Sequence, residues 1–284
     1  MVGAPANAIE NERDPEQAGN EHMRSYRRAL ITGASSGIGA AFAGELPAST
    51  HLLLTGRDHE RLARTAERVA REGRTVETHA ADLTDASQRD QLVDHAEAFG
   101  IDLLINNAGV GRLGRFLDHT PELLRETVLL NVVAVVDLSR RLLPGMMERA
   151  RTARRRAGLI IVSSTAAFAP VPFFATYAAS KAFGLQFTEA LADELRGEPV
   201  DILALCPGAT RTRFGAAAEA SPRQMPGASD PRDVAAEGLA ALGRDTVRVA
   251  GLLNQAAFGP VVLPRRLVTS AVGLAMRFVA GRAR

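Results

Sequence analysis

Short apolar runs alternate with longer amphipathic stretches along most of the chain. Several runs are apolar throughout, as parallel strands buried on both faces are, and the stretches between them have helical spacing. The pattern predicts strands at 28–32, 51–55, 75–80, 102–105, 159–162, 199–206 and 246–250. It predicts helices at 40–46, 59–72, 86–99, 121–148, 175–196 and 233–242. This alternation is typical of an α/β fold with a parallel sheet.

The two ends of the chain differ from its centre. Residues 1–25 are polar and without periodicity, which predicts a disordered tail before a main domain at 26–250. We expect 251–284 to be a C-terminal helical extension, because apolar residues recur on one helical face at 267, 271, 274, 275 and 278. This basic amphipathic helix either packs on its own domain or a partner subunit, which we favour, or rests on an anionic membrane surface through 264–284.

Composition excludes several classes of protein. The 284 residues are 46% hydrophobic and carry a net charge of only +2, which argues against nucleic-acid binding. Cys206 is the single cysteine and the six histidines lack ligand spacing, so we expect no disulfide and no metal site. With no secretory signal and no apolar run of about 18 residues, we expect a cytoplasmic protein. The arginine-rich stretch 149–156 is interpreted as a solvated loop.

A glycine-rich turn follows the first predicted strand and leads into a helix. Gly33 permits a sharp turn, Gly37 lets the backbone approach a pyrophosphate, and Gly39 lets the helix pack closely on the sheet. The free N–H groups of the helix N-terminus then face the phosphates. Alone, such a loop is also compatible with a simple turn. In this context we expect a dinucleotide to be bound by Gly33, Ser35, Ser36, Gly37, Ile38 and Gly39.

The second predicted strand ends at Gly56-Arg57-Asp58, where the adenosine ribose is recognised in such folds. An arginine there accommodates a 2′-phosphate, so Arg57 favours NADP as the cofactor. We interpret Asp58 as the N-cap of the following helix. If Asp58 instead points at the ribose, the preference reverses and NAD is the cofactor.

Polar side chains also follow the third and fourth predicted strands. Asp82, with Leu83 after it, either holds the adenine amino group or caps the helix at 86–99, and the two roles are compatible. Asn107, Ala108 and Gly109 follow the fourth strand and combine amide groups with close backbone approach. Ligands of open α/β sheets bind at this edge, so we expect these residues to contact the dinucleotide.

One polar residue interrupts an otherwise apolar stretch of the predicted helix at 121–148, which begins with Thr120 as N-cap and Pro121 at the first helical position. Asn131 lies within that stretch, and a buried amide needs partners. It either bonds a backbone group or bends the helix and holds a water.

The most informative pair is Tyr177 and Lys181. Lys181 is the only lysine of the chain, and Tyr177 is one of two tyrosines. Positions i and i+4 share a helix face, so both side chains can point into one site. An ammonium can stabilise a phenolate, which makes the tyrosine usable as a general acid or base. Ser164 ends the fifth strand thirteen residues earlier.

Taken in order, these motifs resemble those of the short-chain dehydrogenase/reductase family from about residue 27 to 250. The matching residues are Thr32, Gly33, Gly37, Gly39, Asp82, Asn106 to Gly109, Asn131, Ser164, Tyr177, Lys181, Pro207, Gly208 and Thr212. The resemblance implies a single Rossmann-type doubly wound parallel sheet with helices on both faces. The chain looks like a member of a bacterial branch of uncertain substrate, which carries Thr-Gly-Arg-Asp after the second strand and is taken as NADP-linked. One departure is Ile161, where many members have Asn.

The resemblance also implies an activity and a set of roles. It implies hydride transfer between nicotinamide and a carbonyl or secondary alcohol, with Asn131, Ser164, Tyr177 and Lys181 as catalytic residues. Tyr177 would exchange the proton, Lys181 would lower the pKa of Tyr177 and bind the ribose, and Ser164 would bind the substrate oxygen. Asn131 would hold a water. The loop with Pro207, Gly208, Thr210 and Thr212 would bind the nicotinamide end.

The substrate is expected to be a small apolar carbonyl or alcohol. Ser164 and Tyr177 would bind its oxygen, and Phe173 and Phe214 its apolar part. Loops near the pocket mouth also carry Phe168, Val171, Phe174 and Met225. Residues 213–230 are long enough to form a lid. We expect a homo-oligomer. The rival classes are a non-catalytic dinucleotide-binding regulator or scaffold and a membrane-surface-associated reductase of lipid-like substrates.

Overall fold

The computed structural model describes residues 26–212, 214, 228–258, 265 and 267. The predicted N-terminal tail, most of the predicted lid with Met225, and nearly all of the predicted amphipathic C-terminal face lie outside these residues. Among the described residues, no helix combines the length and apolarity that crossing a membrane would need.

Within the described part of the chain, seven parallel strands form one sheet in the order β3-β2-β1-β4-β5-β6-β7. The order reverses between β1 and β4, so the fold is the expected doubly wound Rossmann-type sheet. The strands are β1 (Arg28–Thr32), β2 (His51–Gly56), β3 (Val76–Ala80), β4 (Leu103–Asn106), β5 (Ala157–Val162), β6 (Val200–Cys206) and β7 (Val247–Val249).

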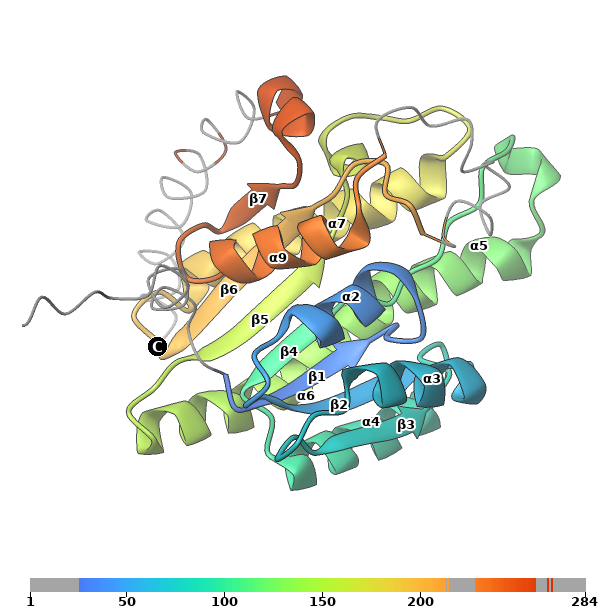
Figure 1. The fold of residues 1–284 in the computed structure, drawn as a ribbon. Coiled ribbons are helices and arrows are strands. Elements are labelled where there is room, and N and C mark those ends of the chain that lie inside the picture. Colours follow the sequence, from blue (N-terminus) through green and yellow to red (C-terminus); the bar gives the residue numbers. More distant parts are fainter. Residues whose placement is uncertain (1–25, 213, 215–227, 259–264, 266, 268–284) are drawn as a thin grey trace, which may run out of the picture.

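Helices cover both faces of this sheet (Figure 1). One face carries α2 (Gly37–Glu45), α3 (His59–Val69) and α9 (Pro231–Ala241). The other carries α4 (Ala86–Phe99), α5 (Pro121–Val128), α6 (Ala134–Thr152) and α7 (Ala175–Glu194). Short 3-10 turns lie at Phe116–Asp118 and Thr165–Phe168.

The strands divide their side chains between the cores on the two faces of the sheet. Leu52 and Leu54 of β2 pack with Phe42 of α2, whereas Leu53 packs on the opposite face with Leu92 of α4. Successive side chains of a strand point to opposite faces, so an uninterrupted apolar run can fill both cores. Because β1 and β4 are neighbours whose following helices cover opposite faces, a crevice opens at their carboxyl ends.

The long helix predicted at 121–148 consists of three parts. Thr120 caps α5 and Pro121 occupies its first turn, as predicted. After Val128 the chain forms a π-helical turn over Leu129–Val133 before α6 continues. Such turns are uncommon and often lie at functional sites. Asn131 is the central residue of this turn, so the π-helical turn coincides with the residue whose polarity interrupts the apolar run.

The interpretation of residues 149–156 as a solvated loop is confirmed for 153–156, which are exposed and non-helical, and wrong for 149–152, which are helical. Helix α6 extends to Thr152, and Arg149 donates to Glu97 and to the carbonyl oxygen of Ile101. Arg156 pairs with Asp201 at 2.7 Å. The acids that pair with Arg149 and Arg156 are therefore distant in the sequence.

Candidate active site

The glycine-rich turn fits against two other loops of the carboxyl edge. Gly33 and Gly37 have φ angles of 66° and 57°, the region that favours glycine. A Cβ on Gly33 would lie 2.9 Å from Ala108 Cα, and one on Gly37 would lie 3.0 Å from Thr212. The turn thus brings the loops after β4 and β6 together. No side chain caps the N-terminus of α2 at Ser36, which leaves its N–H groups for a ligand.

Hydrogen bonds connect the ends of β1 and β4. The Thr32 hydroxyl accepts from the backbone nitrogens of Asn107 and Ala108, each at 2.9 Å. The Asn107 amide donates to the Thr32 carbonyl, also at 2.9 Å. Asn106 turns away and donates to Ser139. Of the two consecutive asparagines, Asn107 is therefore the one at the crevice.

The acidic residues after β2 and β3 have clear local partners. Asp58 accepts from the Arg61 nitrogen as the N-cap of α3, so the cap prediction is confirmed. Asp82 accepts from the nitrogen and the hydroxyl of Thr84. The predicted cap role of Asp82 is wrong, because Asp85 caps α4. Three residues of turn separate Asp82 from that helix, which the linear sequence did not reveal.

Asn131 connects the loop after β4 to α7. Its oxygen accepts from the Val110 nitrogen at 2.9 Å, and its amide donates to the Val110 carbonyl at 2.8 Å. The amide also donates to the Ser180 hydroxyl at 2.9 Å, which in turn donates to the Tyr177 carbonyl. Ser180 was missed from the sequence, although its position one turn after Tyr177 places it on the same helix face.

Tyr177 and Lys181 project from α7 toward the carboxyl ends of the strands. Both are buried, at 8% and 7% exposure. The Ser164 hydroxyl accepts from the Ala166 nitrogen at 3.1 Å and lies close enough to the Tyr177 hydroxyl to influence its pKa. Lys181 Nζ donates to the Val162 carbonyl at 2.9 Å and lies 5.7 Å from the centre of the Tyr177 ring. A Cβ on Gly109 would lie 3.1 Å from both Lys181 Nζ and Asn131 Oδ1, so these residues converge beside that glycine.

Burial determines the protonation of the two groups. It raises the pKa of Tyr177 to about 12 and lowers the pKa of Lys181 to about 8, because it disfavours the charged form of each. The Ser164 hydroxyl opposes the shift of the Tyr177 pKa. In this structure burial therefore sets the direction of the Tyr177 pKa shift, opposite to the lowering expected from Lys181. Cys206 is fully buried and its pKa is raised to about 12, which agrees with an inert core residue.

Aromatic side chains surround the Tyr177 ring. Phe174 stacks on it with ring centres 4.3 Å apart, and Phe214 lies 5.1 Å away at 44°. Phe173 is 61% exposed and lines the mouth of a small pocket that includes Tyr177. Phe168 stacks instead on Phe258. Of the predicted aromatic residues, Phe174 and Phe214 thus contact the tyrosine.

The loop after β6 approaches the site from the opposite side. Pro207 accepts from the Thr165 nitrogen at 2.9 Å, and the Thr210 hydroxyl donates to the Gly208 carbonyl. The Thr212 hydroxyl accepts from the nitrogen of Phe214 at 3.3 Å. The loop therefore places Thr212 next to the glycine-rich turn and Phe214 next to Tyr177.

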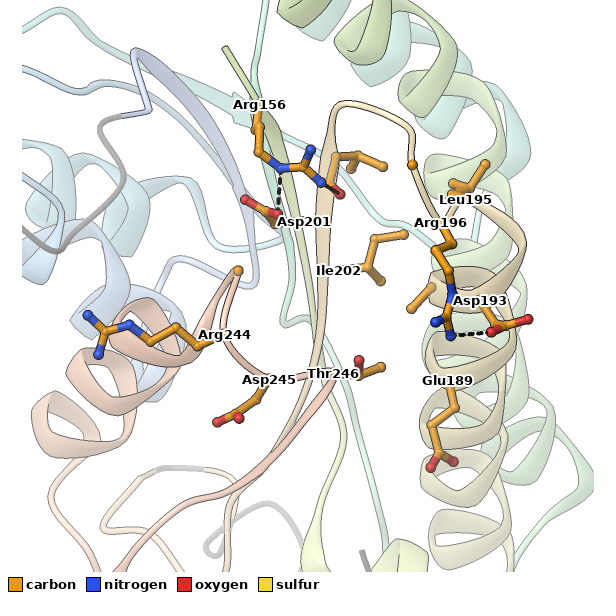
Figure 2. A pocket seen from close by; sticks show the side chains of 14 residues that line it. Arg156, Glu189, Asp193, Leu195, Arg196, Asp201, Ile202, Arg244, Asp245 and Thr246 are labelled. Atoms are coloured by element: carbon orange, nitrogen blue, oxygen red, sulfur yellow. Dashed lines mark hydrogen bonds and ion pairs between the residues drawn. The ribbon is translucent and has the colours of Figure 1, made fainter. Parts of the chain in front are cut away.

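A second pocket, of about 400 Å³, lies at the amino edge of the sheet and is unrelated to these residues (Figure 2). Charged side chains from α7, β6 and the turn before β7 line it. Figure 2 shows Arg156 bonded to Asp201 and Arg196 bonded to Asp193. Nothing in the sequence indicated this pocket.

The parallel sheet, the glycine-rich cradle and the buried tyrosine–lysine pair define a dinucleotide-dependent oxidoreductase of the α/β class. The model of the short chain dehydrogenase family matches residues 27–223, and the chain belongs to this family. It is thus an NAD(P)-dependent oxidoreductase that acts on alcohol and ketone groups.

Individual relatives agree with this assignment. The ketoacyl reductase HetN of Nostoc sp. (strain PCC 7120) is 32% identical over 81% of this chain and 79% of its own length. A short-chain dehydrogenase from Sphingobium yanoikuyae in complex with NADPH has a TM-score of 0.74 and 29% identity, covering 86% of this chain and 95% of that one. One from Burkholderia phymatum in complex with NAD has a TM-score of 0.72 and 27% identity, covering 83% and 91%.

Proposed function

We propose that this chain is an NADP(H)-dependent enzyme that reduces an apolar ketone or aldehyde, or oxidises the corresponding secondary alcohol. The observation that carries the proposal is the buried pair of Tyr177 and Lys181 on one face of α7, with Lys181 Nζ 5.7 Å from the centre of the tyrosine ring and Ser164 nearby. These groups lie at the crevice edge, where ligands of doubly wound sheets bind. The name of the ketoacyl reductase relative supports the direction of carbonyl reduction.

The dinucleotide would lie across the crevice. Its phosphates would be held at the α2 N-terminus, its adenosine beside Arg57, Asp82 and Leu83, and its ribose near Asn107. The nicotinamide end would meet Ala108, Gly109 and the loop with Pro207, Gly208, Thr210 and Thr212. When bound, the nicotinamide supplies or accepts the hydride. Arg57 supports NADP, as does the NADPH complex of a relative, while the NAD complex of another makes NAD the alternative.

The side chains of the site would move the proton. Tyr177, protonated at neutral pH, donates its hydroxyl proton to the substrate oxygen as charge develops there. Ser164 donates a hydrogen bond to the same oxygen. Lys181 is close enough to stabilise the resulting phenolate. Asn131 Oδ1 accepts one hydrogen bond, from Val110, and has a second lone pair for a water that returns the proton through Lys181.

The pocket beside Tyr177 supports an apolar substrate. Phe116, Leu123, Leu124 and Phe173 line it, and Phe174 and Phe214 flank the tyrosine ring. Arg112 and His119 are the basic side chains of that lining. We propose that the ring faces hold the apolar part of the substrate while its oxygen meets Tyr177 and Ser164.

Subunit packing is part of the proposal. Val128, Val133 and Phe183 are exposed apolar side chains at 43%, 37% and 38%, on neighbouring segments of α5, the π-helical turn and α7. Covering them in a homo-oligomer would remove this apolar surface from water. Arg265 pairs with Glu189 of α7, which supports packing of the C-terminal extension over contact with a membrane.

The test is consumption of NADPH with a panel of apolar ketones and aldehydes by the wild type and Tyr177→Phe. Loss of the hydroxyl should lower kcat by about 10²- to 10⁴-fold while the Kd for NADPH stays near that of the wild type. Tyr26→Phe is the matched control, because it removes the other tyrosine hydroxyl, away from the site. Retention of most activity in Tyr177→Phe would refute the proposed role. NADPH binding without any turnover would favour the regulatory or scaffold alternative.

A further inference from the structure

An ion pair joins the end of β2 to α5. Arg57 Nη1 lies 2.8 Å from Glu126 Oε1, and the two side chains are 57% and 26% exposed. Arg57 directly follows Gly56, the last residue of β2, whereas Glu126 lies in the last turn of α5. The pair therefore connects elements 69 residues apart in the sequence.

The ion pair lies beside the phosphate-binding turn. The Ala34 nitrogen donates to the Thr55 carbonyl at 3.0 Å, which holds the turn against the end of β2. A Cβ on Gly56 would lie 3.4 Å from the Ser35 hydroxyl. Arg57 thus begins next to the turn, at the strand end that recognises the adenosine ribose in doubly wound folds.

Glu126 is the acid that opposes Arg57. Asp58 is next to Arg57 in the sequence, but its carboxylate accepts from the Arg61 nitrogen and pairs with the Arg61 guanidinium at 2.9 Å. Among the described residues, the recorded ion-pair partner of Arg57 is Glu126. The charge available to a ligand at this edge therefore depends on both members of the pair.

We propose that Glu126 is a specificity-determining residue that weakens the preference for NADP by occupying Arg57. The inference rests on the proposed NADP(H) function. A 2′-phosphate carries close to two negative charges, so it must compete with the carboxylate for the guanidinium and is repelled by it. A 2′-hydroxyl carries no charge and escapes this repulsion. Glu126 therefore acts through Arg57 and brings the affinities for the two cofactors closer together.

The experiment measures the Kd values for NADPH and NADH by direct titration, for example through quenching of protein or cofactor fluorescence. The variants are Glu126→Gln, Arg57→Ala and the double variant, and Glu122→Gln removes one negative charge from the same helix as the matched control. Glu126→Gln keeps the shape and the hydrogen-bonding capacity of the side chain, so changes in packing are small.

We expect Glu126→Gln to tighten NADPH binding about twofold to fivefold, the range of a partly exposed ion pair, and to leave NADH binding unchanged. The gain should shrink as salt screens the charges and should fall in the Arg57→Ala background. Glu122→Gln should change neither Kd.

The outcomes separate the two proposals. If Arg57→Ala weakens NADPH binding but Glu126→Gln leaves it unchanged, weakens it, or shifts both cofactors equally, the inference is wrong and the NADP proposal stands. If Arg57→Ala leaves NADPH binding unchanged, the proposed NADP preference fails and the inference fails with it.

Discussion

The two edges of the sheet place helix α7 in opposite environments. At the carboxyl edge, Lys181 is buried against the carbonyl of Val162, a neutral partner. At the amino edge, the same helix carries Glu189 and Asp193, both nearly buried and both paired with arginines. One end of the helix thus holds a cation with a neutral partner, and the other holds anions that are neutralised.

The ion pairs at the amino edge stabilise the fold, whereas the lysine at the carboxyl edge serves the proposed reaction. Arginine satisfies several acceptors at once, as Arg156 does with Asp201 and the Val200 carbonyl, and suits fixed ion pairs. A carboxylate beside Lys181 would neutralise the charge that a phenolate requires. The neutral carbonyl orients the ammonium and leaves its charge available, at the cost of the lowered pKa that burial imposes.

The largest expected effect comes from replacing the cation at each edge by the other type, lysine by arginine and arginine by lysine. Lys181→Arg should lower kcat about 10²-fold, because the bulkier guanidinium does not fit between Val162 and Gly109. The matched exchange Arg156→Lys, at the amino edge, should leave kcat unchanged and cost about 1 kcal/mol of unfolding free energy. Steady-state kinetics and urea denaturation measure both. Similar losses of kcat in the two variants would contradict the assignment of catalysis to the carboxyl edge alone.

Breaking an ion pair at the amino edge should affect stability alone. Arg265→Ala leaves Glu189, whose side chain is 6% exposed, without its cation, and should lower the unfolding free energy by about 1 to 3 kcal/mol. Adding Glu189→Gln should recover part of the loss, because it removes the buried charge. Arg244 is an exposed residue that lines the amino-edge pocket together with Glu189. Arg244→Ala serves as the control and should change the unfolding free energy little. A fall in kcat per folded molecule would show that the two edges are coupled.

The smallest effect is the dependence of stability on pH. Between its folded pKa of about 8 and its unfolded value of 10.5, Lys181 binds fewer protons in the folded state, so stability rises with pH. Cys206 and Tyr177 have raised pKa values and act in the opposite direction above about pH 9 and pH 10. Between pH 8 and pH 9 the wild type should therefore gain about 1 kcal/mol relative to Lys181→Met in urea denaturation. If the unfolding free energies of the wild type and Lys181→Met change with pH in parallel, Lys181 keeps its ordinary pKa in the folded protein.

The sequence by itself determined the order of elements, the parallel sheet and most of the residues at the crevice. Apolar runs and helical spacing are local signals, and the spacing of Gly33, Gly37 and Gly39 or of Tyr177 and Lys181 is meaningful within a single element. The cap roles of Asp58 and Thr120 also depend only on neighbouring residues, and both are confirmed.

Only the tertiary structure decided what the charged and polar groups contact. The partners of Asn131, Arg57 and Arg156 are 21, 69 and 45 residues away, so no local pattern reveals them. The same applies to the pKa of Tyr177, because burial from all sides outweighs the opposing effect of Ser164. Lys181 illustrates both parts. The sequence determines its position on the same helix face as Tyr177, whereas its neutral partner and its lowered pKa follow from packing against β5.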